Sequence, residues 1–154
     1  MEILIDNRQD KINIDTDIEQ AIKLVIKRCL EYENVDINYE VSVSIVNNDE
    51  IKELNKRFRK KDTPTDVLSF PMIDDDMIKD QVPILGDIVI SAEKALEQSK
   101  EFNHSFKREI SYLTAHSVFH LLGYDHSHEE EKSIMREKEK SIMKSLKIFK
   151  DTSC

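Results

Sequence analysis

Hydrophobic and polar residues alternate along several short stretches of the chain. The clearest is YEVSVSIV, residues 39–46, in which every second residue is apolar, so one face of the predicted strand is buried. That face consists of Tyr39, Val41, Val43 and Ile45. Three further apolar stretches bounded by turn-forming residues also predict strands: residues 1–6, 67–70 and 84–90.

Between these stretches the apolar residues are spaced by three and four, which is typical of amphipathic helices. A capping box over residues 16–19 predicts the start of the first helix. Its packing side consists of Ile18, Ile22, Val25, Ile26 and Cys29. The second helix follows Asn47 and Asn48, both candidate N-caps, and ends before Pro64. Its packing residues are Ile51, Leu54 and Phe58.

Three more helices are predicted in the second half of the chain. Ser91 and Ser105 are candidate N-caps for helices that run to about Glu101 and into a histidine-rich segment. A final helix spans about residues 129–149 and packs through Met135, Ile142 and Leu146. Because strands and helices are interspersed, the expected class is α/β (α+β): a single domain over residues 1–154, with a mixed sheet of about four strands and about five helices.

Composition and charge narrow the class of protein. The chain has 154 residues, 39% hydrophobic and 35% charged, which is enough for one folded core. Its net charge of −8 argues against nonspecific nucleic-acid binding, so RNA would need a local basic patch and DNA is not expected. Neither a membrane helix nor a secretion signal is evident. With two cysteines and no disulfide framework, a cytoplasmic location is expected.

Three of the five histidines lie in HSVFHLLGYDH, residues 116–126. His116 and His120 are four residues apart, so on a helix they face the same side and can reach one metal ion. Gly123 predicts the end of that helix, after which the chain can turn back and bring His126 to the other two. The pattern indicates an open metal site with positions for water or substrate. The simpler alternative is three ordinary histidines that share no ligand.

The helix that carries these histidines is apolar on nearly every side over residues 112–122, which predicts a central, buried, metal-bearing helix. The spacing also matches the metallopeptidase pattern HExxHxxGxxH at every position but one. Ser117 replaces the glutamate that acts as general base, and a serine cannot take up a proton from water at neutral pH. A metal-activated water or metal-bound phosphate is therefore expected to act on a different substrate.

A basic segment lies in the second predicted helix. Residues 51–61 include six basic residues and a single acidic one, Glu53. One interpretation is a solvated helix end, where cations oppose the helix dipole. The other is a contact with phosphate groups, to which an arginine offers two parallel donors. A separate acidic run within residues 74–83 predicts a solvated loop.

Three motifs in register, RKKDTPTDVLSFP, LGDIVIS and HSVFHLLGYDH, resemble the bacterial YbeY family of rRNA maturation endoribonucleases. The resemblance covers residues 41–126. It implies a single-domain α/β metalloprotein with one metal ion, usually zinc, bound by three histidines, and a functional arginine. It also implies a cytoplasmic role in processing small-subunit ribosomal RNA and in ribosome quality control. The residues that align with these functions are His116, His120, His126 and Arg59.

The chain departs from the family pattern in the first part of the histidine motif. The family has HGxLH where this chain has HSVFH, so Ser117 and Phe119 differ. Serine favours a helix more than glycine does, but it adds a side chain where a substrate could otherwise approach closely. Asp66, in the first motif, is expected either to cap a turn or to accept a hydrogen bond from a ligating histidine. His104 and His128 are expected to be exposed and without a role.

The resulting hypothesis is a metal-dependent endoribonuclease that cleaves single-stranded ribosomal RNA on ribosomal particles, with no membrane partner. The expected ligands of Zn²⁺, or of another divalent transition metal, are His116, His120 and His126. The expected catalytic residues are Arg59 and His116, and the expected substrate-binding residues are Arg59, Lys60 and Lys61. Two alternatives are a metallopeptidase-like hydrolase and a non-catalytic, zinc-stabilised module that binds ribosomes.

Overall fold

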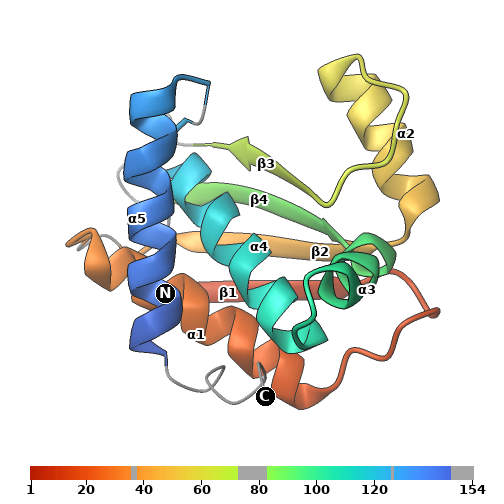
Figure 1. Ribbon diagram of the computed structural model, residues 1–154, viewed down its shortest axis with the longest axis horizontal. Helices are drawn as coiled ribbons and strands as arrows, with labels where there is room; N and C mark the ends of the chain where they lie inside the picture. Colours follow the sequence, from red (N-terminus) through yellow and green to blue (C-terminus); the bar gives the residue numbers. More distant parts are fainter. Residues whose placement is uncertain (36–37, 73–82, 126, 147–154) are drawn as a thin grey trace.

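Four strands form a mixed sheet in the order β1-β2-β4-β3 (Figure 1). The computed structural model describes residues 1–35, 38–72, 83–125 and 127–146. β1 is parallel to β2 and β2 to β4, whereas β3 is antiparallel to β4. The strands are β1 Glu2–Asn7, β2 Glu40–Val46, β3 Val67–Pro71 and β4 Ile84–Ser91.

Within the described residues, the chain forms five helices. They are α1 Thr16–Tyr32, α2 Asn48–Arg59, α3 Ala92–Glu101, α4 Phe106–Leu121 and α5 Glu129–Ser145. Helix α4 is central, because it contacts α1, α3 and α5 as well as β3 and β4. The predicted central helix is therefore confirmed.

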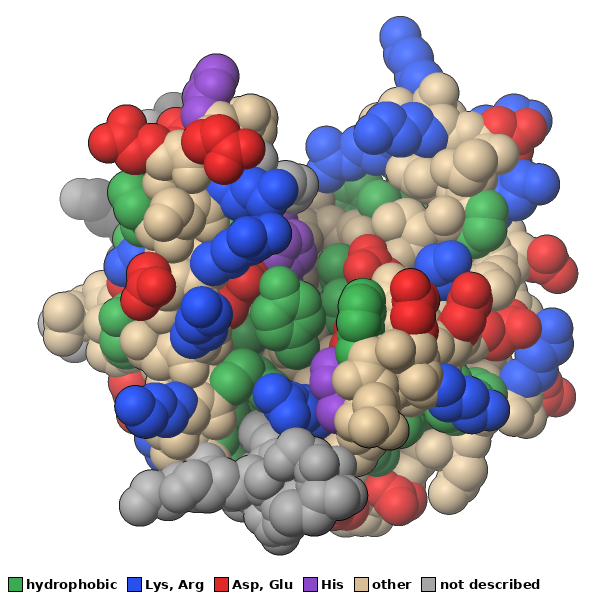
Figure 2. All heavy atoms as spheres, viewed as in Figure 1, with side chains coloured by type: hydrophobic (Ala, Val, Ile, Leu, Met, Phe, Trp, Pro, Cys, Tyr) green, Lys and Arg blue, Asp and Glu red, His purple; other side chains and the backbone are tan. Residues whose placement is uncertain are grey.

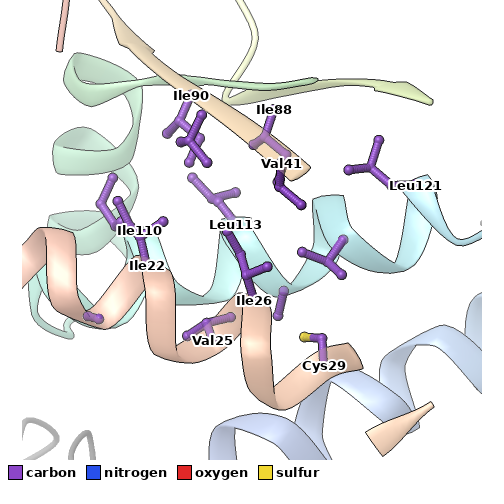
Figure 3. Close-up of a cluster of buried hydrophobic side chains, with 14 of the residues drawn as sticks. Ile22, Val25, Ile26, Cys29, Val41, Ile88, Ile90, Ile110, Leu113 and Leu121 are labelled. Atoms are coloured by element: carbon purple, nitrogen blue, oxygen red, sulfur yellow. The ribbon is translucent and has the colours of Figure 1, made fainter. Parts of the chain in front are cut away.

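The main hydrophobic core lies between α1, α4 and one face of the sheet. Figure 3 shows Ile22 and Ile26 of α1 beside Leu113 of α4, with Val41 and Ile88 of the sheet above them. All five side chains are at most 2% exposed. Burying an aliphatic side chain of this size contributes roughly 1.5–3 kcal/mol. This packing fixes α4, and with it the histidines, relative to the sheet.

Helix α2 covers the opposite face of the sheet. Ile51 of α2 belongs to a second, smaller buried cluster that includes Val89 of β4. Ile88 and Ile90, which flank Val89 along β4, belong to the main core instead. Successive side chains of a strand point to opposite faces, so the two clusters lie on opposite sides of the sheet. α2 thus reaches the cavity described below from a different side than α4 does.

The predicted fold class is confirmed, and two local predictions are wrong. The first helix is capped by Asp15, whose side chain accepts a hydrogen bond from a backbone N–H in the first turn at 2.9 Å, so Thr16 lies inside the helix. Aspartate is a stronger N-cap than threonine. Phe58 is 56% exposed, because it reaches only the edge of the Phe70 ring near the end of α2.

Several predicted features lie outside the described residues. These are His126, nearly all of the acidic run in residues 74–83, and the predicted end of the last helix at Phe149. Helix α5 as described ends at Ser145. Among the helices of the described ranges, none has the length and apolar character needed to cross a membrane.

Candidate functional site

A cavity of about 590 Å³ opens where the end of α2, the edge strand β3 and the C-terminal part of α4 meet. We call it the His–Arg cavity, because Arg59 of α2 lines it together with His116 and His120 of α4. Figure 2 shows a furrow between α5 on the left and α2 on the right, with a histidine side chain in its depth and Lys and Arg side chains on both walls. The fold therefore brings together two sequence motifs that lie far apart along the chain.

His116 and His120 face each other across one turn of α4. Their Nε2 atoms are 3.2 Å apart, and their ring centroids are 4.7 Å apart. Two nitrogens that bind one tetrahedral zinc ion, each at about 2.0–2.1 Å, are about 3.3–3.4 Å from each other. The pair therefore fits a shared metal ion with little rearrangement. No group of three metal-ligating side chains is found among the described residues, and His126, the predicted third ligand, is not one of them.

Glu139 of α5 orients the ring of His116. Its Oε2 atom is 2.5 Å from Nδ1 of His116, and its Oε1 atom accepts a hydrogen bond from the Tyr112 hydroxyl at 3.0 Å. Only 3% of Glu139 is exposed. A carboxylate can only accept hydrogen bonds, so Nδ1 carries a proton, and in the neutral imidazole the lone pair of Nε2 then faces His120. This tautomer is the one that a metal ligand needs.

Tyr112 completes this arrangement from the preceding turn of α4. Burial first, and then the negative charge of Glu139, raise the pKa of the Tyr112 phenol above its ordinary value of 10.0. The hydroxyl therefore stays protonated near neutral pH and remains a donor. Sequence reasoning missed Glu139. The available signal was its position four residues after Met135 and three before Ile142, on the packing side of α5.

Arg59, in the last turn of α2, lies against the edge strand. Its Nη2 atom donates to the carbonyl oxygen of Ser69 at 2.8 Å, and its guanidinium carbon lies 5.7 Å from the centroid of the Phe70 ring. A guanidinium has five N–H donors, so others are left for a ligand in the cavity. Lys61 also lines the cavity. Lys60, which adopts the left-handed conformation (φ 60°) that ends α2, does not line it.

Ser117 lies away from the cavity surface. It is fully buried, and its Oγ atom is 2.5 Å from Oγ of Ser69 on β3. Strands β3 and β4 and helix α4 also approach one another closely at Gly86 of β4. A Cβ atom on Gly86 would lie 2.5 Å from the Phe70 carbonyl oxygen and 2.7 Å from Leu121. The side chain that Ser117 adds to the family pattern therefore joins α4 to β3 and does not line the cavity.

Asp66 fixes the turn before β3. Its Oδ1 atom accepts hydrogen bonds from the backbone N–H of Val67 at 2.7 Å and from the Thr65 hydroxyl at 3.3 Å. Its Oδ2 atom is 3.4 Å from Nε2 of Gln98 on α3. These contacts favour the turn-capping interpretation over a hydrogen bond to a ligating histidine.

His104 is half-buried and paired, so the expectation that it is exposed is wrong. Its side chain is 16% exposed, and its Nε2 atom is 2.7 Å from Oε1 of Glu109, which is 3% exposed. Gln98 donates to the other oxygen of Glu109 at 2.9 Å. The first turn of α4 carries this carboxylate inward, and a buried carboxylate needs such donors. His128, as expected, is exposed.

Comparisons with known proteins show the family of the chain. A family model described as Endoribonuclease YbeY matches residues 4–147. The chain belongs to this family. The endoribonuclease YbeY of Thermoanaerobacter sp. (strain X514) is 55% identical to it over 160 residues, which cover 96% of this chain and 99% of the relative. That of Clostridioides difficile (strain 630) is 50% identical over 153 residues, which cover 98% of this chain and 100% of the relative.

A solved structure shares the YbeY-type fold of the chain. The solution structure of TM1509 from Thermotoga maritima aligns with a TM-score of 0.63 and 32% sequence identity, over 94% of this chain and 88% of that one. The YbeY family consists of rRNA-maturation endoribonucleases, hydrolases that act on RNA, and it is metal-dependent. The resemblance seen in the sequence is thus confirmed. The metallopeptidase and the non-catalytic alternatives gain no support from these relatives.

Proposed function

We propose that this chain is a zinc-dependent endoribonuclease that cleaves single-stranded RNA in the His–Arg cavity. The observation that supports this most directly is that Arg59, His116 and His120 line one cavity, with the two Nε2 atoms 3.2 Å apart. A guanidinium group thus lines the same cavity as a pair of imidazole nitrogens. The proposed ligands of the ion are His116, His120 and His126.

Each side chain has a defined part in the proposed reaction. Arg59 binds the scissile phosphate through the N–H groups that it does not donate to Ser69, and offsets the charge that develops on phosphorus. Lys61 adds a positive charge on the same side, with Lys60 next to it at the end of α2. Glu139 keeps His116 in the ligating tautomer. His116, His120 and His126 would hold a zinc ion, which would supply a Lewis acid and a water whose pKa is lowered to about 7.

The proposed biological role is the maturation of small-subunit ribosomal RNA and ribosome quality control, on ribosomal particles in the cytoplasm. It is supported by the names of the relatives, which are endoribonucleases of one family. RNA precursors compared between cells that lack the protein and cells that carry Arg59→Glu or His116→Ala test this role. Both variants should leave the same unprocessed ends as the deletion. Mature ends in all of these cells would contradict it.

The cleavage site is tested with Arg59→Glu on purified protein. Arg57→Glu is the matched control, because Arg57 is exposed on the same helix and does not line the cavity. We expect Arg59→Glu to abolish cleavage of a single-stranded RNA, while the melting temperature and the zinc content by elemental analysis stay unchanged. The control should keep its activity. Equal activity in the two variants would contradict the assignment of the site.

The ends of the products identify the nucleophile. Attack by water leaves a phosphate monoester, whereas attack by the neighbouring ribose hydroxyl leaves a cyclic phosphate. Mass spectrometry of the fragments from one defined RNA distinguishes the two products, and the same fragments should be absent when zinc is removed by a chelator.

A further inference from the structure

A second cavity, of about 630 Å³, lies nearer the N-terminal end of α4 than the His–Arg cavity does. We call it the Tyr112 cavity, because Tyr112 lines it and the Tyr112 ring is stacked on that of His116 with centroids 6.2 Å apart. Asp66 lines both cavities. Glu139 lines the Tyr112 cavity and contacts His116 of the other. The two spaces are therefore neighbours that share side chains.

One row of residues on α4 connects the cavities. Arg108, Tyr112, His116 and His120 follow one another at intervals of four residues, so they lie on the same face of the helix, about 6 Å apart along its axis. The first two line the Tyr112 cavity and the last two line the His–Arg cavity. In Figure 2 the furrow continues below the central histidine, over apolar side chains, to a second histidine.

Cations surround the mouth of the Tyr112 cavity in an otherwise acidic protein. Arg136 and Lys140, one turn apart on α5, are exposed, and Arg108 of α4 is half-buried on the other side. None of the three has an ion-pair partner among the described residues. Cations that are not held in ion pairs can attract a polyanion.

The interior of the Tyr112 cavity has a different character. Two of its acidic side chains, Glu109 and Glu139, are each 3% exposed and already paired with His104 and His116, and the third, Asp66, accepts a hydrogen bond in the turn before β3. They repel a phosphate group and, being paired, do not require a bound cation. The walls are aromatic: Tyr112 is 36% exposed and Phe102 is 60% exposed. A neutral, flat ligand suits this interior, with its phosphates left at the mouth.

From this division we propose that the Tyr112 cavity binds the base of a nucleotide next to the scissile phosphate of RNA. The base stacks on Phe102 or Tyr112, as bases do on exposed aromatic side chains. The adjoining phosphates contact Arg136, Lys140 and Arg108. Both N–H groups of Gln98 point to protein carboxylates, which leaves its side-chain oxygen to accept a hydrogen bond from a base amine. A volume of about 630 Å³ is within the usual range for small-molecule pockets.

This subsite rests on the proposed function for its place in the reaction, but its binding can be measured separately. The probe is a fluorescein-labelled, single-stranded RNA hexamer, 2′-O-methylated to resist cleavage, and the readout is fluorescence anisotropy with zinc-loaded protein. The test variant is Arg136→Glu with Lys140→Glu. The control is Lys23→Glu with Lys27→Glu, which has the same change in charge and the same spacing on α1, outside both cavities.

We expect the α5 double variant to weaken hexamer binding about tenfold or more at low salt, and the α1 double variant to change it less than twofold. Equal binding by the α5 variant and the wild type overturns the subsite. So does an equal loss in both double variants, because the effect is then one of net charge. Unchanged melting temperatures show that the variants are folded.

Stacking is tested by removing one base at a time from the hexamer. In the wild type one abasic position should weaken binding at least about fivefold, the lower limit for base–aromatic stacking. In Phe102→Ala with Tyr112→Leu the same position should have no further effect. An abasic penalty that persists in this variant overturns the stacking role. If the hexamer binds in this way but the protein cleaves no RNA, the proposed function is overturned, whereas the subsite still stands.

Discussion

Two histidine–glutamate pairs each include one residue of α4, His116 in one and Glu109 in the other, and they differ in what surrounds them. In one, Nδ1 of His116 is 2.5 Å from Glu139, and in the other, Nε2 of His104 is 2.7 Å from Glu109. Both glutamates are 3% exposed, and the histidine side chains are 23% and 16% exposed. By burial and distance the two pairs are nearly the same.

The difference lies in the second ring nitrogen and its neighbour. His116 uses Nδ1 for its glutamate, so its Nε2 atom faces a second histidine, His120, at 3.2 Å. His104 uses Nε2 for its glutamate and stands between α3 and α4, with Gln98 as the other donor to Glu109. A buried histidine–carboxylate pair therefore does not by itself indicate a metal site. A metal site is indicated when a second side chain able to bind metal faces the ring nitrogen that does not contact the carboxylate.

The largest expected effect is a difference in RNA cleavage between variants of the two histidines. His116→Asn and His104→Gln each replace an imidazole by an amide of matching reach, which can still donate to the glutamate. We expect His116→Asn to lower RNA cleavage by more than the roughly 100-fold loss caused by removing a metal ligand's hydrogen-bond partner. His104→Gln should stay within a few-fold of the wild type. Similar losses in both variants would show that the two pairs are functionally equivalent.

The next effect concerns metal affinity. Glu139→Gln removes the charge that supports His116 as a ligand, so the zinc dissociation constant should rise roughly 10–100-fold. Glu109→Gln makes the same change in the other pair and should leave zinc affinity as it is. Competition with a chromogenic chelator measures both constants. An equal change in the two variants would contradict the assignment of Glu139 to the metal site.

The third prediction concerns stability, for which the glutamate of the His104 pair should matter whether or not zinc is bound. Glu109→Ala leaves His104 and Gln98 without their shared acceptor, and an unsatisfied buried polar group costs about 1–3 kcal/mol. We expect this loss in the free energy of unfolding by urea, in zinc-loaded and zinc-free protein alike. A chelator should lower the melting temperature of Glu109→Ala and of the wild type by the same amount, but lower that of Glu139→Ala less.

The smallest effect is on pH dependence. Only the His116 pair has a titratable third member, Tyr112, whose pKa is raised by burial and by Glu139. The folded protein therefore retains this proton at a pH where the unfolded chain loses it, so the free energy of unfolding falls as pH rises above about 10. Tyr112→Phe should remove part of that fall, since Tyr124 also has a raised pKa, from its hydrogen bond to Glu33.

The matched control for this pH experiment is Tyr32→Phe, at a position that is 44% exposed. Urea unfolding between pH 7 and 11 gives the slope for each protein. The control should have the slope of the wild type. A Tyr112→Phe slope equal to that of the wild type would mean that the phenol does not contribute to the pH dependence.

Local sequence patterns predicted most of the fold. The alternation over residues 39–46 gave the central strand β2, and the apolar spacing from Ile18 to Cys29 gave the buried side of α1. Spacing of four placed His116 and His120 on one face of α4. These predictions are correct because the underlying forces act over a few residues: backbone periodicity, capping and the burial of one face. The error at Thr16 is of the same local kind, since Asp15 competes for the same cap.

Only the tertiary structure decided what surrounds the histidines. His116 meets Glu139 because α5 packs against α4, and Arg59 reaches the same cavity because α2, on the other face of the sheet, ends beside β3. Nothing in the spacing distinguishes Glu139 from the other acidic residues of α5 except its place on the packing side. The sequence by itself determined which side chains share a helix face. The tertiary arrangement of helices α2, α4 and α5 determined which of those side chains meet, because such contacts depend on the packing of the whole core.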